Sequence, residues 1–131
     1  MRLMGRSSWA ALVVLVLAAT QAGAGQRHRW WKSDDVKAEL GLTESQSAGI
    51  DEIYAAALPK QRELKQRLDR KEEELSQLID AMEAEEWEVT LLIDKVEVVR
   101  SELSKSRILM LYRIHRELSA EQLDALHDWW D

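Results

Sequence analysis

Two short strings decide the fold of this chain: Leu42-Thr43-Glu44-Ser45-Gln46 and Leu118-Ser119-Ala120-Glu121-Gln122. Each reads as leucine, a hydroxyl residue, two variable positions and glutamine, which is the pattern of a capping box. The hydroxyl of Thr43 or Ser119 accepts from a backbone N–H of the first helical turn, and the side chain of Gln46 or Gln122 accepts from the N–H of the cap. The strings therefore predict two helix starts, and they bracket a stretch with the pattern of one long helical hairpin.

The doubled pattern resembles the LTxxQ signature of the Spy/CpxP family of periplasmic proteins, and it is similar to the related heavy-metal-resistance proteins of the CnrX and ZraP type. The resemblance covers residues 30–128. The second copy departs slightly, with Ser119 instead of threonine and Ala120 where proline is common, and neither change removes the capping chemistry. The resemblance implies a periplasmic protein whose antiparallel dimers form a thin, curved cradle.

The first two dozen residues have the pattern of a secretory signal peptide. Arg2 and Arg6 supply a positive amino-terminal region, Trp9–Ala19 is an apolar run of 11 residues, and Ala22–Ala24 supplies small residues for a signal peptidase. We expect cleavage after Ala24 and no stable membrane span afterwards. The alternative is an uncleaved anchor, although a span needs about 20 apolar residues. The predicted division is a signal peptide over 1–24, a basic and aromatic leader over 25–32, and a helical domain over 33–131.

The composition excludes several classes of function. Loss of Arg2 and Arg6 with the signal peptide leaves 16 basic residues against 24 acidic ones. This balance argues against a nucleic-acid partner, because phosphate binding needs a basic surface. The chain has no cysteine, so no disulfide stabilises it after export. It also lacks a cysteine nucleophile, a glycine-rich phosphate loop and the HExxH and EF-hand patterns, so we predict a protein that is not an enzyme.

The residues after the leader predict four helices and no strand. Ser33 is expected to cap a short first helix that ends at Gly41, and Thr43 is expected to cap a second, long helix. Pro59 lies inside the apolar stripe of that helix, and we expect a kink there, since the periodicity resumes in phase. The expected order is helices over about 33–41, 43–82, 89–118 and 119–130, with the hairpin turn at Glu83–Glu88.

The two long helices do not predict a self-sufficient core. Their apolar stripes are narrow, and the stretch Lys60–Glu74 is mostly charged. An antiparallel pair with one thin stripe each buries little apolar area and needs a further layer. A second copy is the simplest such layer, because two-fold homodimers are the commonest oligomers. We therefore predict an all-α fold, a long antiparallel helical hairpin with short flanking helices that forms a curved homodimer.

The segment Gln61–Glu72 interleaves charged and apolar side chains at helical spacing, which usually marks a solvated face. In Spy-like cradles the corresponding segment lines the concave surface, so the resemblance implies weak binding of unfolded polypeptides. The implied function is ATP-independent binding of unfolded envelope proteins, or of a membrane sensor protein in the manner of CpxP. The candidate client-binding residues are Leu64, Arg67, Leu68, Lys71, Leu75, Arg100 and Arg107.

The alternative function is that of a periplasmic heavy-metal sensor or metal-binding resistance protein. CnrX-like sensors bind nickel or cobalt with His, Glu and Met side chains, which suit borderline transition metals. The candidate ligands in this chain are Glu52, His115 and His28, and the candidate ions are zinc, copper, nickel and cobalt. The other interpretation of His115 is structural, since a helix C-terminus favours positive charge. Apart from such a metal ion, we predict no cofactor.

Two tryptophan pairs flank the domain, Trp30–Trp31 and Trp129–Trp130. We expect the hairpin to bring them to the same end of the molecule. They are interpreted either as a patch that contacts clients or membrane, or as packing of the terminal helices onto the hairpin.

Overall fold

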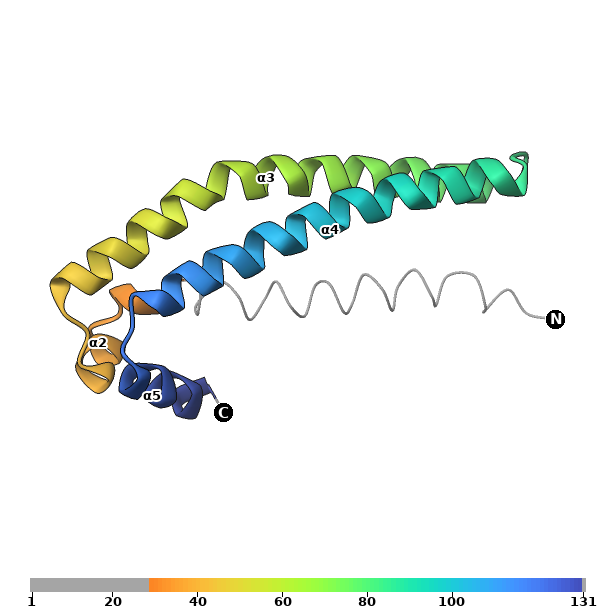
Figure 1. Ribbon diagram of the computed structural model, residues 1–131. Coiled ribbons are helices and arrows are strands. Elements are labelled where there is room, and N and C mark those ends of the chain that lie inside the picture. Colours follow the sequence, from red (N-terminus) through yellow and green to blue (C-terminus); the bar gives the residue numbers. More distant parts are fainter. Residues whose placement is uncertain (1–28, 131) are drawn as a thin grey trace. The chain divides into compact units, whose positions relative to one another are not determined.

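The computed structural model describes residues 29–130, and the side chain of Trp130 lies outside that description (Figure 1). The predicted signal peptide and His28 also lie outside the described residues. Every regular element in the described part is helical, as the predicted all-α class requires. The elements form two compact units, which join in the sequence between Leu42 and Thr43.

The first unit contains a 3-10 helix, η1 (Trp30–Lys32), and a short α-helix, α2 (Asp34–Leu40), which pack against each other. The rings of its two tryptophans lie edge to face, with centroids 5.6 Å apart, and both are buried. Ser33 occupies the predicted N-cap position, but its side chain makes no capping hydrogen bond. Gly41 ends α2 as predicted, at a φ of 66°, where a residue without a Cβ fits best.

The second unit is a long antiparallel hairpin of α3 (Glu44–Ala81) and α4 (Glu86–Arg116), followed by the short helix α5 (Ala120–Trp130). The two long helices pack against each other (Figure 1). Helix α3 continues through Pro59, as predicted, and Figure 1 shows that it bends in its amino-terminal half. A proline removes one backbone hydrogen bond and crowds the preceding turn, which accounts for a bend in a continuous helix.

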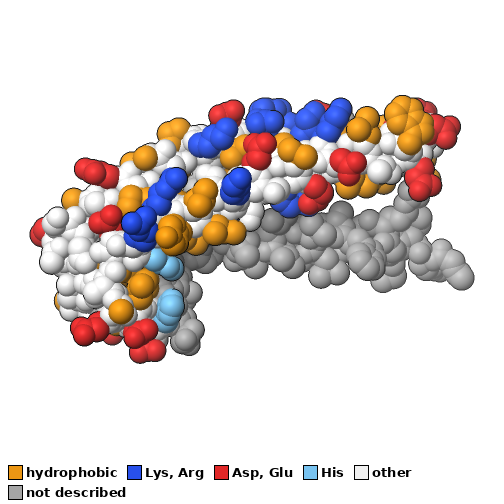
Figure 2. Space-filling view, viewed as in Figure 1, with side chains coloured by type: hydrophobic (Ala, Val, Ile, Leu, Met, Phe, Trp, Pro, Cys, Tyr) orange, Lys and Arg blue, Asp and Glu red, His pale blue; other side chains and the backbone are white. Residues whose placement is uncertain are grey.

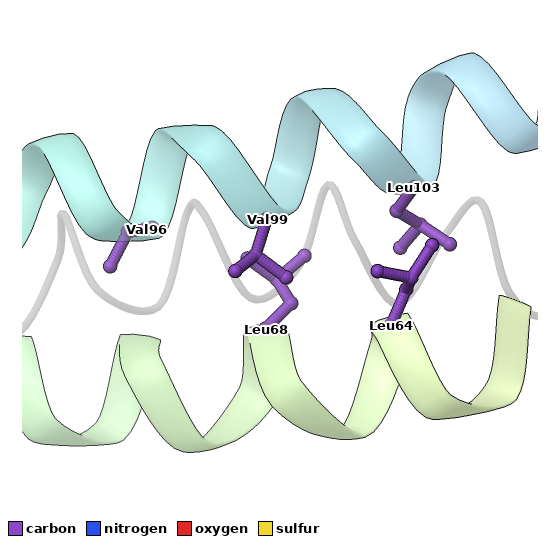
Figure 3. Close-up of a cluster of buried hydrophobic side chains, with 5 residues drawn as sticks. All are labelled: Leu64, Leu68, Val96, Val99 and Leu103. Atoms are coloured by element: carbon purple, nitrogen blue, oxygen red, sulfur yellow. The ribbon is translucent and has the colours of Figure 1, made fainter. Parts of the chain in front are cut away.

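A single row of apolar side chains forms the core of the hairpin (Figure 3). Leu64 and Leu68 of α3 pack against Val96, Val99 and Leu103 of α4, and all five are buried. The residues of each helix in this row are three or four positions apart, so they share one face. The predicted apolar stripe is therefore the seam of the hairpin in its middle part.

The apolar stripe predicted from the sequence is longer than the row of side chains that the structure buries. Ile79 and Met82 near the end of α3, and Ile93 near the start of α4, are exposed although they continue the predicted stripe. Each long helix has one long neighbour within its unit and can bury only one face against it. Apolar side chains that lie off that face stay in contact with solvent.

The hairpin turn is shorter than predicted, because α4 begins at Glu86 inside the predicted turn Glu83–Glu88. Glu85 is the N-cap of α4 and forms a capping box with Glu88, whose carboxylate accepts from the Glu85 N–H at 2.8 Å. A pair of glutamates can close a capping box, and the carboxylates are also favoured at the positive end of the helix dipole. The prediction that residues 86–88 belong to the turn was therefore wrong.

Met82 caps the end of α3 with a φ of 55°, a left-handed conformation that non-glycine residues seldom adopt. Its side chain is 74% exposed, so packing does not compensate for the strain. We expect Met82→Gly to raise the free energy of unfolding by about 1 kcal/mol. Thermal denaturation followed by circular dichroism measures the change. The matched control is Gly41→Ala, which adds a Cβ at a similar φ and should destabilise by a similar amount.

Candidate functional site

The two signature strings each form a capping box. The hydroxyl of Thr43 accepts from the N–H of Gln46 at 3.0 Å, and the hydroxyl of Ser119 accepts from the N–H of Gln122 at 3.1 Å. In return, Gln46 Oε1 accepts from the Thr43 N–H at 3.1 Å, and Gln122 Oε1 accepts from the Ser119 N–H at 2.9 Å. These bonds satisfy N–H groups that a helix start leaves without an intrahelical partner. The leucines that precede the caps, Leu42 and Leu118, are both buried.

The same two glutamines also bond to each other, a contact that the capping-box pattern does not predict. Gln46 Nε2 donates to Gln122 Oε1 at 2.8 Å, and Gln122 Nε2 donates to Gln46 Oε1 at 3.0 Å. Gln46 Nε2 also donates to the backbone carbonyl of Glu117 at 2.9 Å. We call this group of side chains the glutamine junction. It joins the start of α3 to the end of α4 and the start of α5 across 76 positions of sequence.

The junction needs the amide group in particular. A glutamine side chain carries both donors and an acceptor, whereas an ionised glutamate only accepts. Each amide oxygen therefore serves its own capping box and accepts from the opposite amide, while each NH₂ group bonds across the junction. A capping box alone tolerates glutamate, so the cross-helix bonds explain why glutamine stands in both strings.

Two histidines, one on α4 and one on α5, lie together in the structure. The rings of His115 on α4 and His127 on α5 meet edge to face, with centroids 6.5 Å apart, and Figure 2 shows them next to each other. His115 is half-buried and His127 is exposed. The predicted companion Glu52 is exposed, and within residues 29–130 no three His, Cys, Asp or Glu side chains form a group suited to a metal ion. The structure thus pairs His115 with His127 rather than with the predicted Glu52.

The outer face of α4 is apolar and basic near its C-terminus. Ile108 is 62% exposed and Tyr112 is 59% exposed, and they are four residues apart on the side of α4 opposite the buried Ile114. The Arg116 guanidinium lies over the Tyr112 ring, 5.8 Å from its centroid. Figure 2 shows basic and apolar side chains side by side over this part of α4. We call residues Lys105–Arg116 the basic apolar segment.

Ion pairs occupy several of the basic side chains in the middle of the hairpin. Arg100 of α4 bonds to Glu72 of α3 at 2.9 Å and to Glu97 on its own helix. The hydrogen bond with Glu72, together with the nearby charge of Glu97, raises the pKa of the Arg100 guanidinium above its ordinary value. Arg67 pairs across the hairpin with Glu102 at 3.9 Å. These exposed pairs contribute little stability, but they hold two predicted client-binding cations against the chain's own carboxylates.

Comparison with models of known protein families matches residues 28–128 to the description "LTXXQ motif family protein". The chain belongs to the LTXXQ motif family. This family includes the Spy/CpxP-like periplasmic proteins, as the resemblance implied. Comparisons with curated proteins and with solved structures gave no significant match.

The LTXXQ family is all-helical and non-enzymatic, and its members are typically periplasmic. No helix within residues 29–130 combines the length and the apolar composition that crossing a membrane requires.

The structure separates the predicted client-binding residues of this LTXXQ protein into two groups. Leu64 and Leu68 lie in the core seam, and Leu64 is only 1% exposed, so their side chains are unable to contact a client in the folded chain. The assignment of these two leucines to client binding conflicts with their burial, because the thin hairpin uses them to hold α3 against α4. The other predicted residues are accessible: Arg67, Lys71 and Leu75 are half-buried, and Arg100 and Arg107 are exposed.

Of the four tryptophans in the predicted patch, the structure describes the side chains of three. Trp30 and Trp31 are buried, and Trp129 on α5 is exposed. That the two pairs lie together stays a prediction, because they belong to different units.

Proposed function

We propose that this LTXXQ protein is a periplasmic, ATP-independent chaperone-like protein that binds unfolded envelope proteins through the basic apolar segment of α4. The observation that carries the proposal is the composition of the exposed surface there. Between Lys105 and Arg116 the sequence contains four Lys or Arg residues and no Asp or Glu. The large apolar side chains exposed in the same stretch are Ile108, Leu109, Leu111 and Tyr112.

This combination suits weak capture of unfolded chains. An exposed apolar patch of this kind is uncommon on proteins that act alone and usually marks a binding surface. The cations attract acidic clients at a distance, and the apolar side chains then contact the hydrophobic residues that an unfolded client exposes. A membrane sensor protein that presents an acidic, apolar surface belongs to the same class of partner.

The net negative charge of the chain does not oppose this mechanism, because charge is segregated along the hairpin. The stretch Lys95–Arg116 has six Lys or Arg residues and two carboxylates, whereas Glu72–Asp94 has nine carboxylates and no basic residue. At physiological ionic strength the electrostatic screening length is about 8 Å. A client at the basic apolar segment therefore responds mainly to the local positive charge.

We also propose that the protein acts as a homodimer. The hairpin seam has five buried side chains in its central cluster, while much of α4 exposes apolar groups. A second copy would cover part of that surface and add the layer that a two-helix hairpin lacks. Sedimentation equilibrium of the signal-free chain at micromolar concentration should give the mass of two chains, and a folded monomer at all concentrations contradicts this proposal.

The double variant Ile108→Ser/Tyr112→Ser is expected to lose most of the chaperone-like activity, because it removes two of the largest exposed apolar groups of the segment. Light scattering of reduced α-lactalbumin, an acidic client, at equal molar ratio measures the suppression of aggregation. The matched control is Leu91→Ser/Val98→Ser, which removes two exposed apolar side chains elsewhere on α4. Equal activity in both variants, or equal loss, contradicts the assignment to this segment.

The second candidate function is binding of a transition metal, and the histidine pair favours it. Neutral imidazoles are ligands that zinc, copper and nickel prefer. With metal–nitrogen bonds of about 2.0–2.1 Å, two imidazoles on one ion have centroids roughly 5–6 Å apart. The observed separation of 6.5 Å between the rings of His115 and His127 is slightly wider than this range. Water or a carboxylate would complete the coordination.

Metal binding predicts a measurable role for His127. Calorimetric titration of the signal-free protein with zinc, copper, nickel and cobalt should show an affinity tighter than about 1 mM, equivalent to about 4 kcal/mol. His127→Gln should weaken that affinity at least tenfold, and so should His115→Gln. The control is His28→Gln, which leaves the pair intact. Loss of binding only in the control variant would show that the metal is held elsewhere.

A further inference from the structure

The tip of the hairpin, residues Ile79–Leu91, presents large apolar side chains to solvent. Met82 is 74% exposed and Trp87 is 66% exposed, and Ile79 and Leu91 beside them are also exposed. These are the end of α3, the turn and the start of α4, so the exposed groups form one short region of the second unit. Most turns carry small polar residues, and an exposed tryptophan and methionine there need a reason beyond chain reversal.

The charge around these side chains has a single sign. The tip contains five carboxylates and no Lys, Arg or His: Asp80, Glu83, Glu85, Glu86 and Glu88. None of these five pairs with a Lys or Arg side chain among residues 29–130. At the right-hand end of Figure 2, apolar and acidic side chains lie next to one another. The tip is therefore an apolar surface in a negative field.

We propose that the hairpin tip docks a cationic amphipathic segment of another protein. The apolar side of such a segment would cover Met82 and Trp87, and its Lys and Arg side chains would lie against the carboxylates of the tip. The face of the Trp87 indole also attracts a guanidinium or ammonium group. Both components of the surface, the apolar groups and the unpaired carboxylates, then have a complementary partner.

Two other occupants are less suited to the tip. A bilayer would accept an exposed tryptophan, but anionic lipid headgroups repel the five carboxylates. A second copy of this chain would have to bring its own basic apolar segment, Lys105–Arg116, to the tip, and that segment is the surface proposed above for clients. In addition, Arg67, Lys71 and Arg100 of the basic middle part already pair with carboxylates of their own chain. A positively charged foreign partner has neither disadvantage.

This docking site is independent of the proposed client-binding segment. The tip is acidic, whereas Lys105–Arg116 is basic, so the two surfaces select partners of opposite charge. A cationic probe is repelled by the basic apolar segment and attracted by the tip. The variant Ile108→Ser/Tyr112→Ser should therefore bind such a probe like the unaltered protein, whatever its effect on chaperone-like activity.

The test uses a labelled amphipathic helical peptide of lysine and leucine, about 18 residues or five turns long, and the signal-free protein. Fluorescence anisotropy measures the dissociation constant. Met82→Gly/Trp87→Ser should weaken binding at least tenfold. The melting temperature should not fall, because both side chains are exposed and glycine suits the left-handed backbone at position 82. Unchanged binding in this variant overturns the proposal.

Charge variants separate docking from general attraction to an acidic protein. Glu83→Lys/Glu86→Lys should weaken peptide binding at least tenfold and reduce its salt dependence. The control Glu121→Lys/Asp124→Lys makes the same change in net charge at exposed positions of α5, and its binding should stay within twofold of the unaltered protein. An equal loss in the control shows only nonspecific attraction and overturns the proposal.

Two further measurements identify the competing occupants. Vesicles of phosphatidylglycerol and phosphatidylethanolamine should not sediment the protein. Sedimentation that disappears in Met82→Gly/Trp87→Ser, with peptide binding unchanged, assigns the tip to membrane instead. Sedimentation equilibrium of the same variant should match the unaltered protein, and conversion of a dimer to a monomer would assign the tip to a second copy. Either result overturns the proposal.

Discussion

Replacing Leu64 by alanine is expected to lower the free energy of unfolding by about 3 kcal/mol, within the range of about 2–5 kcal/mol for buried leucines. Leu64 is 1% exposed and lies in the five-residue cluster that holds α3 against α4. The cavity left by the deletion adds to the lost transfer free energy of the side chain. Because this core is small, the loss is a large share of a stability that is typically about 5–15 kcal/mol.

Urea denaturation followed by circular dichroism measures this change. The control is Leu111→Ala, at an exposed position of α4, which should alter the free energy of unfolding by less than about 0.5 kcal/mol. If the two variants lose equal stability, the seam in Figure 3 is not the core of the hairpin. Any loss of the proposed chaperone-like activity in Leu64→Ala should follow the fraction of unfolded protein, because the buried Leu64 side chain makes no client contact.

Replacing Gln46 by glutamate is expected to destabilise the protein by about 2 kcal/mol although the capping box survives. A glutamate carboxylate still accepts from the Thr43 N–H, as in many capping boxes. It no longer donates to the Glu117 carbonyl or to Gln122 Oε1, and it sets a negative charge against both oxygens. An acceptor left without its donor in a part-buried group costs about 1–3 kcal/mol. Protonation of the new carboxyl group at a pH of about 4 restores one donor. The loss in the free energy of unfolding should therefore be smaller at that pH.

A double-mutant cycle with Gln122→Glu measures the coupling between the two glutamines. Each single variant removes one of the two reciprocal bonds and strains the other, so the double variant should differ from the sum of the single changes by about 1 kcal/mol or more. Gln66→Glu, at an exposed position of α3, is the control for the chemical change alone. Additive effects would show that the junction is two separate helix caps.

Local chemistry explains why the sequence predicted the helix starts so well. A capping box involves residues three positions apart, so Thr43 with Gln46 and Ser119 with Gln122 can be recognised without knowledge of the rest of the chain. The same holds for Gly41, which suits a left-handed C-cap, and for the three- and four-residue spacing of the seam. The turn was less well predicted, because Glu85 also functions as a cap.

The candidate sites depended on contacts that spacing does not reveal. Spacing did not predict that His115 lies beside His127, because that contact depends on how the chain turns from α4 into α5. Periodicity also failed to separate Leu64, which is buried, from Ile79, which is exposed. Both continue one stripe, and only the position of α4 decides which part of that stripe is covered.

The amino-acid sequence by itself determined where the helices of this LTXXQ protein begin, that no strand interrupts them, and that positive and negative charge are separated along the hairpin. Such features arise from interactions between residues a few positions apart. Only the tertiary structure decided that Gln46 and Gln122 bond to each other across 76 positions, and which apolar side chains stay exposed. Those outcomes depend on the packing of whole helices, which brings distant residues into contact and leaves neighbours on opposite faces.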